Sequence, residues 1–141
     1  MEVGGDNMAI SKQEYAKKIG VLGEQIIIAA ERYAKHGEAA NFKTEKDLEE
    51  FKRKWLLIVD DFRVVQSGIN ELDIPEGYEE KGQELRKAYQ KYVDYIEEKT
   101  MKFGVEAMDS GEIDLIQKLE MEQSKKIKKL TQELTKEMFG K

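Results

Sequence analysis

The sequence lacks cysteine altogether and contains a single histidine, His36. Without cysteine the chain forms no disulfide and offers no thiolate for a metal or a nucleophilic reaction. One histidine is also too few for the histidine-dependent triads, the usual zinc sites and the paired Glu-x-x-His motifs of di-iron bundles. We therefore expect no metal, no cofactor and no enzymatic activity. We interpret His36 as a polar residue at a helix end.

Long apolar runs are absent as well. The longest run, Ile26–Ala30, is far shorter than the roughly 20 residues that a membrane-spanning helix needs. The first residues have neither the basic stretch nor the apolar stretch of a signal peptide. We therefore expect no transmembrane segment and a cytoplasmic location. The cell envelope or secretion is the alternative if a leader has been removed.

Basic residues are fewer than acidic ones. The chain has 24 lysines and arginines against 29 aspartates and glutamates, a formal net charge of -5. An acidic surface repels phosphate backbones, so we expect no nucleic-acid partner. The most basic stretch is Lys125–Lys129, "KKIKK", in which Ile127 falls on an apolar helix face. This pattern favours a solvated helix face over a nucleic-acid site.

Proline occurs only at Pro75, and good helix formers dominate the long segments. Ser11 with Glu14, and Thr44 with Asp47, have the spacing of residues that cap helix starts. The sequence predicts a flexible segment over residues 1–10 and one helical domain over 11–141. The expected helices span about 12–36, 45–72, 76–108 and 112–138.

Apolar residues recur at alternating steps of three and four in each predicted helix, which places them on one face. The second helix shows this most clearly, with Leu48, Phe51, Trp55, Ile58, Phe62, Val65, Ile69 and Leu72. Such regularity is typical of helices packed side by side. Short connections then favour an all-α, antiparallel up-down-up-down four-helix bundle. The alternative is an elongated pair of helical hairpins that dimerises.

The glycines and the proline have local interpretations. Asp73 is a plausible cap for the third helix, with Pro75 at its first position, where the missing N–H costs nothing. Gly82 would admit a bulky neighbour at this corner. Gly20 and Gly23 lie in the middle of the first helix, where we expect them to allow close approach of another helix.

Two sets of residues are candidates for binding. Tyrosines at helical spacing would form either a ligand-binding seam or ordinary core with hydroxyls at its rim; they are Tyr15, Tyr33, Tyr78, Tyr89 and Tyr92. Apolar residues spaced by seven also lie away from the main stripes, and we expect them to form an oligomer or partner patch. They are Val21 and Ile28 on the first helix and Leu57 and Val64 on the second.

The stretch from Trp55 to Glu98 reads "WLLIVDDFRVVQSGINELDIPEGYEEKGQELRKAYQKYVDYIEE". It resembles helical-hairpin segments of small uncharacterised proteins and lipoproteins from Gram-positive bacteria. The resemblance implies a helical hairpin and a cell-envelope setting, and it implies no catalytic residue. The chain departs from that pattern because it lacks the lipoprotein signal and the lipidation cysteine. Leu56 and Leu57 also follow Trp55 where secreted helical hairpins have a Trp-x-Gly turn.

Two functions follow from these patterns. The first is a non-enzymatic interaction or structural module that binds another protein or itself through helix faces. The alternative is a binder of a small apolar ligand, held between helices by the tyrosine-rich seam.

Overall fold

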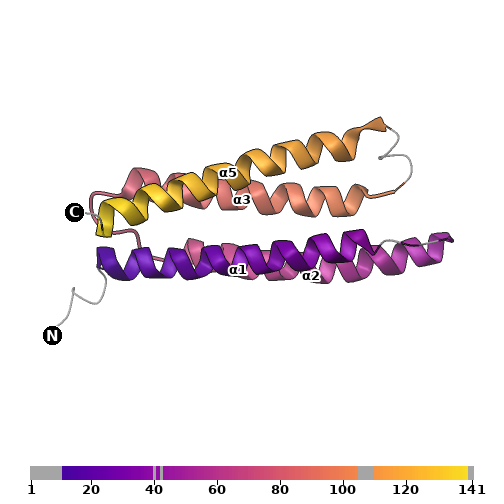
Figure 1. The fold of residues 1–141 in the computed structure, drawn as a ribbon, viewed down its shortest axis with the longest axis horizontal. Helices are drawn as coiled ribbons and strands as arrows, with labels where there is room; N and C mark the ends of the chain where they lie inside the picture. The colour runs from indigo at the N-terminus through magenta and orange to yellow at the C-terminus, as the bar shows by residue number, and fades with distance from the viewer. Residues whose placement is uncertain (1–10, 40, 42, 105–109, 140–141) are drawn as a thin grey trace.

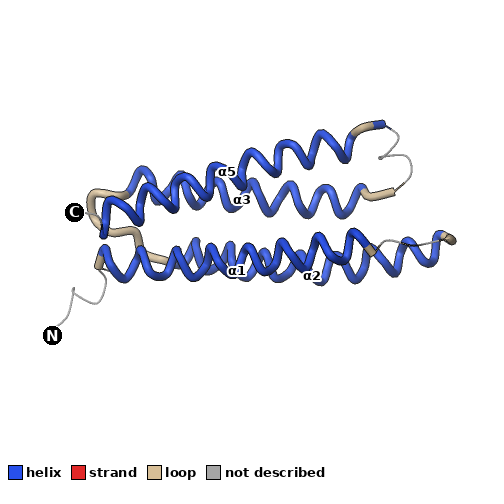
Figure 2. Tube along the Cα trace, in the orientation of Figure 1, coloured by secondary structure: helices blue, strands red, loops and turns tan. Residues whose placement is uncertain are grey.

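The fold is a four-helix bundle, in a computed structural model that describes residues 11–39, 41, 43–104 and 110–139. The helices are α1 (Lys12–Glu38), α2 (Glu45–Glu71), α3 (Glu79–Lys102) and α5 (Glu112–Phe139). Consecutive helices run in opposite directions, and the described segments contain no strand (Figures 1 and 2). Helix α1 packs on α2, α2 on α3, α3 on α5 and α5 on α1. The predicted all-α bundle within one chain is therefore confirmed.

Two helices begin at the predicted caps. The Ser11 hydroxyl accepts a hydrogen bond from the backbone N–H of Glu14 at 3.1 Å, and Thr44 accepts one from Asp47 at the same distance. Each cap satisfies a backbone donor that the first helical turn leaves free. Helices α1, α2 and α5 match the predicted ranges to within two residues at each end. The predicted flexible segment, residues 1–10, lies outside the described residues.

The apolar stripes form the core. In α2 the buried members are Phe51, Trp55, Phe62, Val65 and Ile69, as the periodicity predicts. Ile58 is only half-buried, and its neighbour Val59 is buried instead. The other helices contribute the side chains Tyr15, Ala16, Ile19, Ile26, Ala29 and Tyr33 from α1, Leu85, Ala88, Tyr89, Tyr92, Val93 and Ile96 from α3, and Ile127, Leu130, Leu134 and Met138 from α5.

The corner between α2 and α3 differs from the prediction in detail. Pro75 is not in the first helical turn, since α3 begins at Glu79. Asp73 does not cap that helix, because the residue before it is Tyr78 and no side chain caps it. Instead, the connection forms a hydrogen-bonded turn, in which the backbone N–H of Tyr78 donates to the carbonyl oxygen of Pro75 at 3.1 Å. Gly77 has a φ of 93°, a conformation that favours glycine.

Gly82 has the role that the sequence suggested. The Ile74 side chain packs directly on it, so that a Cβ at position 82 would lie 2.7 Å from Ile74 Cδ1. The corner therefore packs against the first turn of α3 through Ile74. That helix ends at Lys102, where the predicted one continued to 108, because Phe103 has an extended ψ of 130°. Residues 105–109 are outside the described residues.

Polar groups also enter the core, which the apolar stripes did not predict. The Tyr33 hydroxyl lies 2.6 Å from the Thr100 hydroxyl, and Thr100 in turn donates to the Ile96 carbonyl at 2.8 Å. The Lys99 ammonium donates to the Glu120 carboxylate at 2.6 Å, with both side chains largely buried. These contacts tie α3 to α1 and α5 by hydrogen bonds that a purely apolar seam would lack.

Candidate functional site

The five tyrosines do not line one seam. Tyr15, Tyr33, Tyr89 and Tyr92 are buried in the core, whereas Tyr78 is half-buried at the α2–α3 corner. Burial raises the pKa of each of the four buried hydroxyls above its ordinary value. The structure therefore places these four as packing residues of the core, the second of the two roles that the sequence left open for them. Of the five, Tyr92 lines a surface groove.

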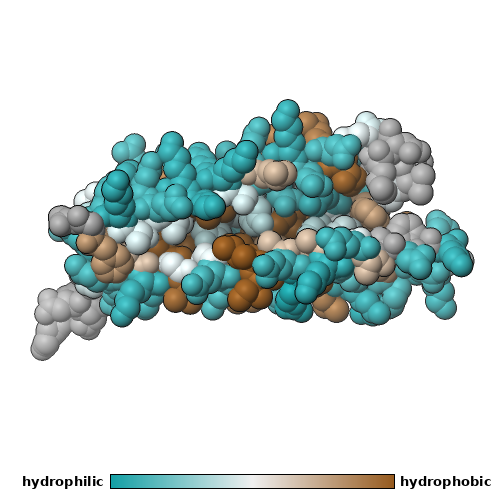
Figure 3. Space-filling model, in the orientation of Figure 1, coloured by the Kyte–Doolittle hydropathy of each residue, from teal (hydrophilic) through white to brown (hydrophobic). Residues whose placement is uncertain are grey.

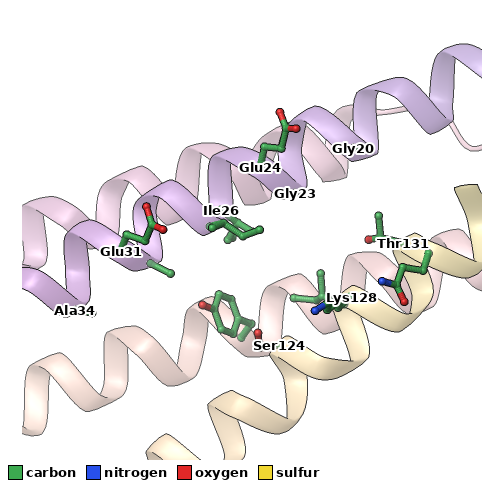
Figure 4. Close-up of a pocket in the computed structure, with 14 residues that line it drawn as sticks. Gly20, Gly23, Glu24, Ile26, Glu31, Ala34, Ser124, Lys128 and Thr131 are labelled. Carbon is green, nitrogen blue, oxygen red and sulfur yellow. The ribbon is translucent and has the colours of Figure 1, made fainter.

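That groove runs between α1 and α5 and has a volume of about 570 Å³. Volumes of this size are typical of pockets that hold small molecules. Figure 4 shows the gap between the two helices and the side chains along it. The α1 wall consists of small and apolar residues flanked by two glutamates, namely Gly20, Gly23, Glu24, Ile26, Ile27, Ala30, Glu31 and Ala34. The α5 wall consists of Ser124, Ile127, Lys128, Thr131 and Gln132.

The glycines of α1 explain why the groove is open. A Cβ added at Gly20 or Gly23 would have no heavy atom of the described chain within 4 Å, apart from the backbone of its own helix and its chain neighbours. The expectation that these glycines allow close helix approach is therefore wrong. They remove side chains from a seam that α5 does not close.

The groove has an uneven charge distribution. Lys128 lines the groove and makes no ion pair with a described residue. Its neighbours Lys125, Lys126 and Lys129 do not line the groove and likewise make no ion pair with a described residue. In Figure 4 the carboxylates of Glu24 and Glu31 point away from α5, whereas Lys128 and Thr131 lie in the gap. The Thr131 hydroxyl is buried and has no hydrogen-bond partner within the described chain. The α5 wall thus supplies two polar groups without partners, Lys128 and Thr131, opposite the glycines, alanines and isoleucines of α1.

The predicted apolar patch lies on the outer face of α1 and α2. Val21, Ile28, Leu57 and Val64 are each between 52% and 69% exposed. Ile28 and Val64 line the same shallow depression, about 280 Å³ in volume, so two of the four meet across the helix pair. Figure 3 views the side of the bundle on which α1 and α5 lie in front, and on this side apolar side chains lie over the middle of α1 among polar ones.

An ion pair lies in the same depression. The Arg32 guanidinium donates to the Asp61 carboxylate, and both residues line the depression together with Ile28 and Val64. Both partners stay accessible to solvent, because the Arg32 side chain is 60% exposed and the Asp61 side chain 41% exposed.

His36 has a structural role at the end of α1. Its Nε2 lies 3.0 Å from the Phe51 carbonyl oxygen, and its ring stacks on the Phe51 ring with 4.3 Å between centroids. Within the part of the chain that the structure describes, no three histidine or acidic side chains gather as a metal site would require. No helix among these residues is long and apolar enough to cross a bilayer.

The class that the structure defines is an antiparallel four-helix bundle with an apolar outer face on α1 and α2 and an open groove between α1 and α5. Comparisons with family models, with curated proteins and with solved structures found no match. The resemblance to Gram-positive helical-hairpin proteins therefore stays a prediction.

Proposed function

We propose that the protein is a non-enzymatic interaction module that binds a second copy of itself through the outer face of α1 and α2. The observation that supports this most directly is the exposed apolar set of Val21, Ile28, Leu57 and Val64, which follows the α1–α2 pair. Scattered exposed apolar residues are common, but residues spaced by seven that meet across neighbouring helices, as Ile28 and Val64 do, are typical of helix-packing surfaces.

The charges beside this face support a self-complementary contact. Arg32 and Asp61 supply one charge of each sign next to Ile28 and Val64. A twofold axis through such a face brings the cation of each copy toward the anion of the other. Two chains of net charge -5 repel each other at long range, so we expect salt to strengthen the association.

Light scattering on the purified protein tests this proposal. The wild-type chain is expected to show twice the chain mass at high concentration, and the double variant Ile28→Lys/Val64→Lys the mass of one chain. Met121→Lys is the matched control, because Met121 is also about half exposed but lies on α5. A single-chain mass for the wild type at all concentrations would contradict self-association.

A second function, binding of a small ligand with an apolar part, is supported by the α1–α5 groove. Its volume and its apolar α1 wall suit a small molecule rather than a second helical bundle. Binding at this groove does not depend on the α1–α2 face, so the two functions are tested separately.

A further inference from the structure

The shape of the α1–α5 groove suits a long, narrow ligand. Its α1 wall extends from Gly20 to Ala34, which at 1.5 Å per residue is about 21 Å. Side chains are missing at Gly20 and Gly23, near one end of this wall, and short at Ala30 and Ala34, near the other. A single alkyl chain laid along the groove would cover Ile26 and Ile27 and remove apolar surface from water.

The chemistry of the opposite wall suits an anionic head group. Lys128 lines the groove and supplies a charged donor that pairs with no described carboxylate, whereas the neighbouring Lys129 does not line the groove. Thr131 also lines the groove, and its hydroxyl is buried without a partner in the described chain, so that rotation of this side chain toward the groove would let it donate to a carboxylate oxygen. Hydrogen bonds from charged donors to carboxylates are among the strongest in proteins.

The acidic residues of the groove do not oppose this arrangement directly. Glu24 and Glu31 lie on the α1 edge, and their carboxylates point away from α5 in Figure 4. A head group beside Lys128 therefore meets the basic side of the groove.

We propose that the α1–α5 groove binds a free long-chain monocarboxylate of the fatty-acid type. The alkyl chain lies along Ile26, Ile27 and Ala30, and the carboxylate accepts hydrogen bonds from Lys128 and Thr131. This inference rests on the second function proposed above, ligand binding in the groove. It adds the chemical class of the ligand and the residues that select it.

Calorimetric titration with three molecules of equal chain length tests the inference. The probes are laurate, lauryl alcohol and laurylamine, each kept below its micelle-forming concentration. Laurate is expected to bind at one site per chain and at least tenfold more tightly than the amine. One charge-assisted hydrogen bond of ordinary strength changes a binding affinity by about a factor of ten. Lys128→Gln is expected to lower laurate affinity about tenfold and to leave the alcohol unchanged. Lys129→Gln is the matched control and retains wild-type affinity.

A second variant locates the site. Gly23→Leu places a side chain in the empty space of the groove, where nothing in the described chain obstructs it. We expect this variant to keep its helical circular dichroism, to melt no earlier than the wild type and to lose laurate binding. Laurate binding that survives in well-folded Gly23→Leu would overturn the site.

The outcomes separate the inference from the function on which it rests. Equal or tighter binding of laurylamine, or no effect of Lys128→Gln, would overturn the carboxylate selection while leaving a ligand groove. If none of the three molecules binds, the proposed ligand-binding function fails, and the inference fails with it.

Discussion

Helix α1 packs against α2 on one side and α5 on the other, and the two seams are filled differently. Toward α2 the seam holds large rings: Tyr33 stacks on Trp55 with 4.6 Å between centroids, and the Trp55 indole donates to the Tyr33 carbonyl at 3.0 Å. Toward α5 the same helix presents Gly20, Gly23 and Ala30, and about 570 Å³ of the seam stays open.

Glycines show the contrast most simply, because one residue type has opposite surroundings at the two seams. Gly37 faces the Trp55 ring, and Gly68 faces Leu22, with added Cβ atoms only 3.0 Å and 2.8 Å from their nearest neighbours. Gly20 and Gly23 face open space. A glycine in a helix interior weakens the helix, and at the α2 seam closer packing compensates for that cost. At the α5 seam the described chain offers no such compensation.

The largest effect is expected at the filled seam. Trp55→Ala removes a buried ring that contacts Tyr33, Phe51 and Phe103, so we expect the free energy of unfolding to fall by about 3–5 kcal/mol. Chemical denaturation measures this loss. Leu115→Ala, on α5 and more than half exposed, is the control and should change stability by no more than about 0.5 kcal/mol. Similar losses for the two variants would contradict the assignment of filled and exposed faces.

Placing leucine at one glycine of each seam sharpens the comparison. Gly68→Leu forces a side chain against Leu22, and we expect it to destabilise the protein by about 1–3 kcal/mol. Gly23→Leu enters open space and improves helix propensity, so we expect a gain of up to about 1 kcal/mol. Denaturation midpoints of the two variants should therefore move in opposite directions. A loss of stability in both would show that the α1–α5 seam is closed.

Alkaline pH is expected to have a smaller, graded effect. Burial raises the pKa of Tyr33, Tyr89 and Tyr92. The unfolded chain therefore releases these phenolic protons at about pH 10, while the native state still keeps them. The unfolded state then binds fewer protons, and the free energy of unfolding falls as pH rises through about 9 to 11. Denaturation curves across this range measure the slope, which Tyr33→Phe should reduce. Tyrosinate absorbance from these residues before unfolding would contradict the prediction.

Much of the fold could be predicted from the sequence, because helix periodicity and caps are local signals. The stripe from Phe51 to Ile69 and the caps Ser11 and Thr44 are where the pattern placed them. The start of α3 was misplaced, since Pro75 and Asp73 satisfy the rules for a helix start as well as Glu79 does. The left-handed conformation of Gly77 and the packing of Ile74 on Gly82 set the start of α3, and the second depends on how the corner folds back on the helix.

The exposed patch was predictable and the groove was not. Val21, Ile28, Leu57 and Val64 are exposed because they lie off the stripes, which is a property of each helix alone. The groove depends on the distance between α5 and α1, which the sequence of neither helix determines alone. A signal was present in the three-four spacing of Gly20, Gly23, Ala30 and Ala34, but small residues at that spacing fit a tight seam equally well. Thr100 lies four residues after Ile96 on the buried face of α3, but a threonine at that position did not by itself indicate the hydroxyl contact with Tyr33.

The difference between the two seams is tested most directly by an amide NMR titration with laurate. Glycine signals are well suited, because Gly20 and Gly23 line the open seam while Gly37 and Gly68 lie at the filled one. We expect saturable shifts at Gly20 and Gly23 and none at Gly37 and Gly68. Shifts confined to Gly37 and Gly68, or no shift at any of the four, would contradict an open ligand-binding seam between α1 and α5.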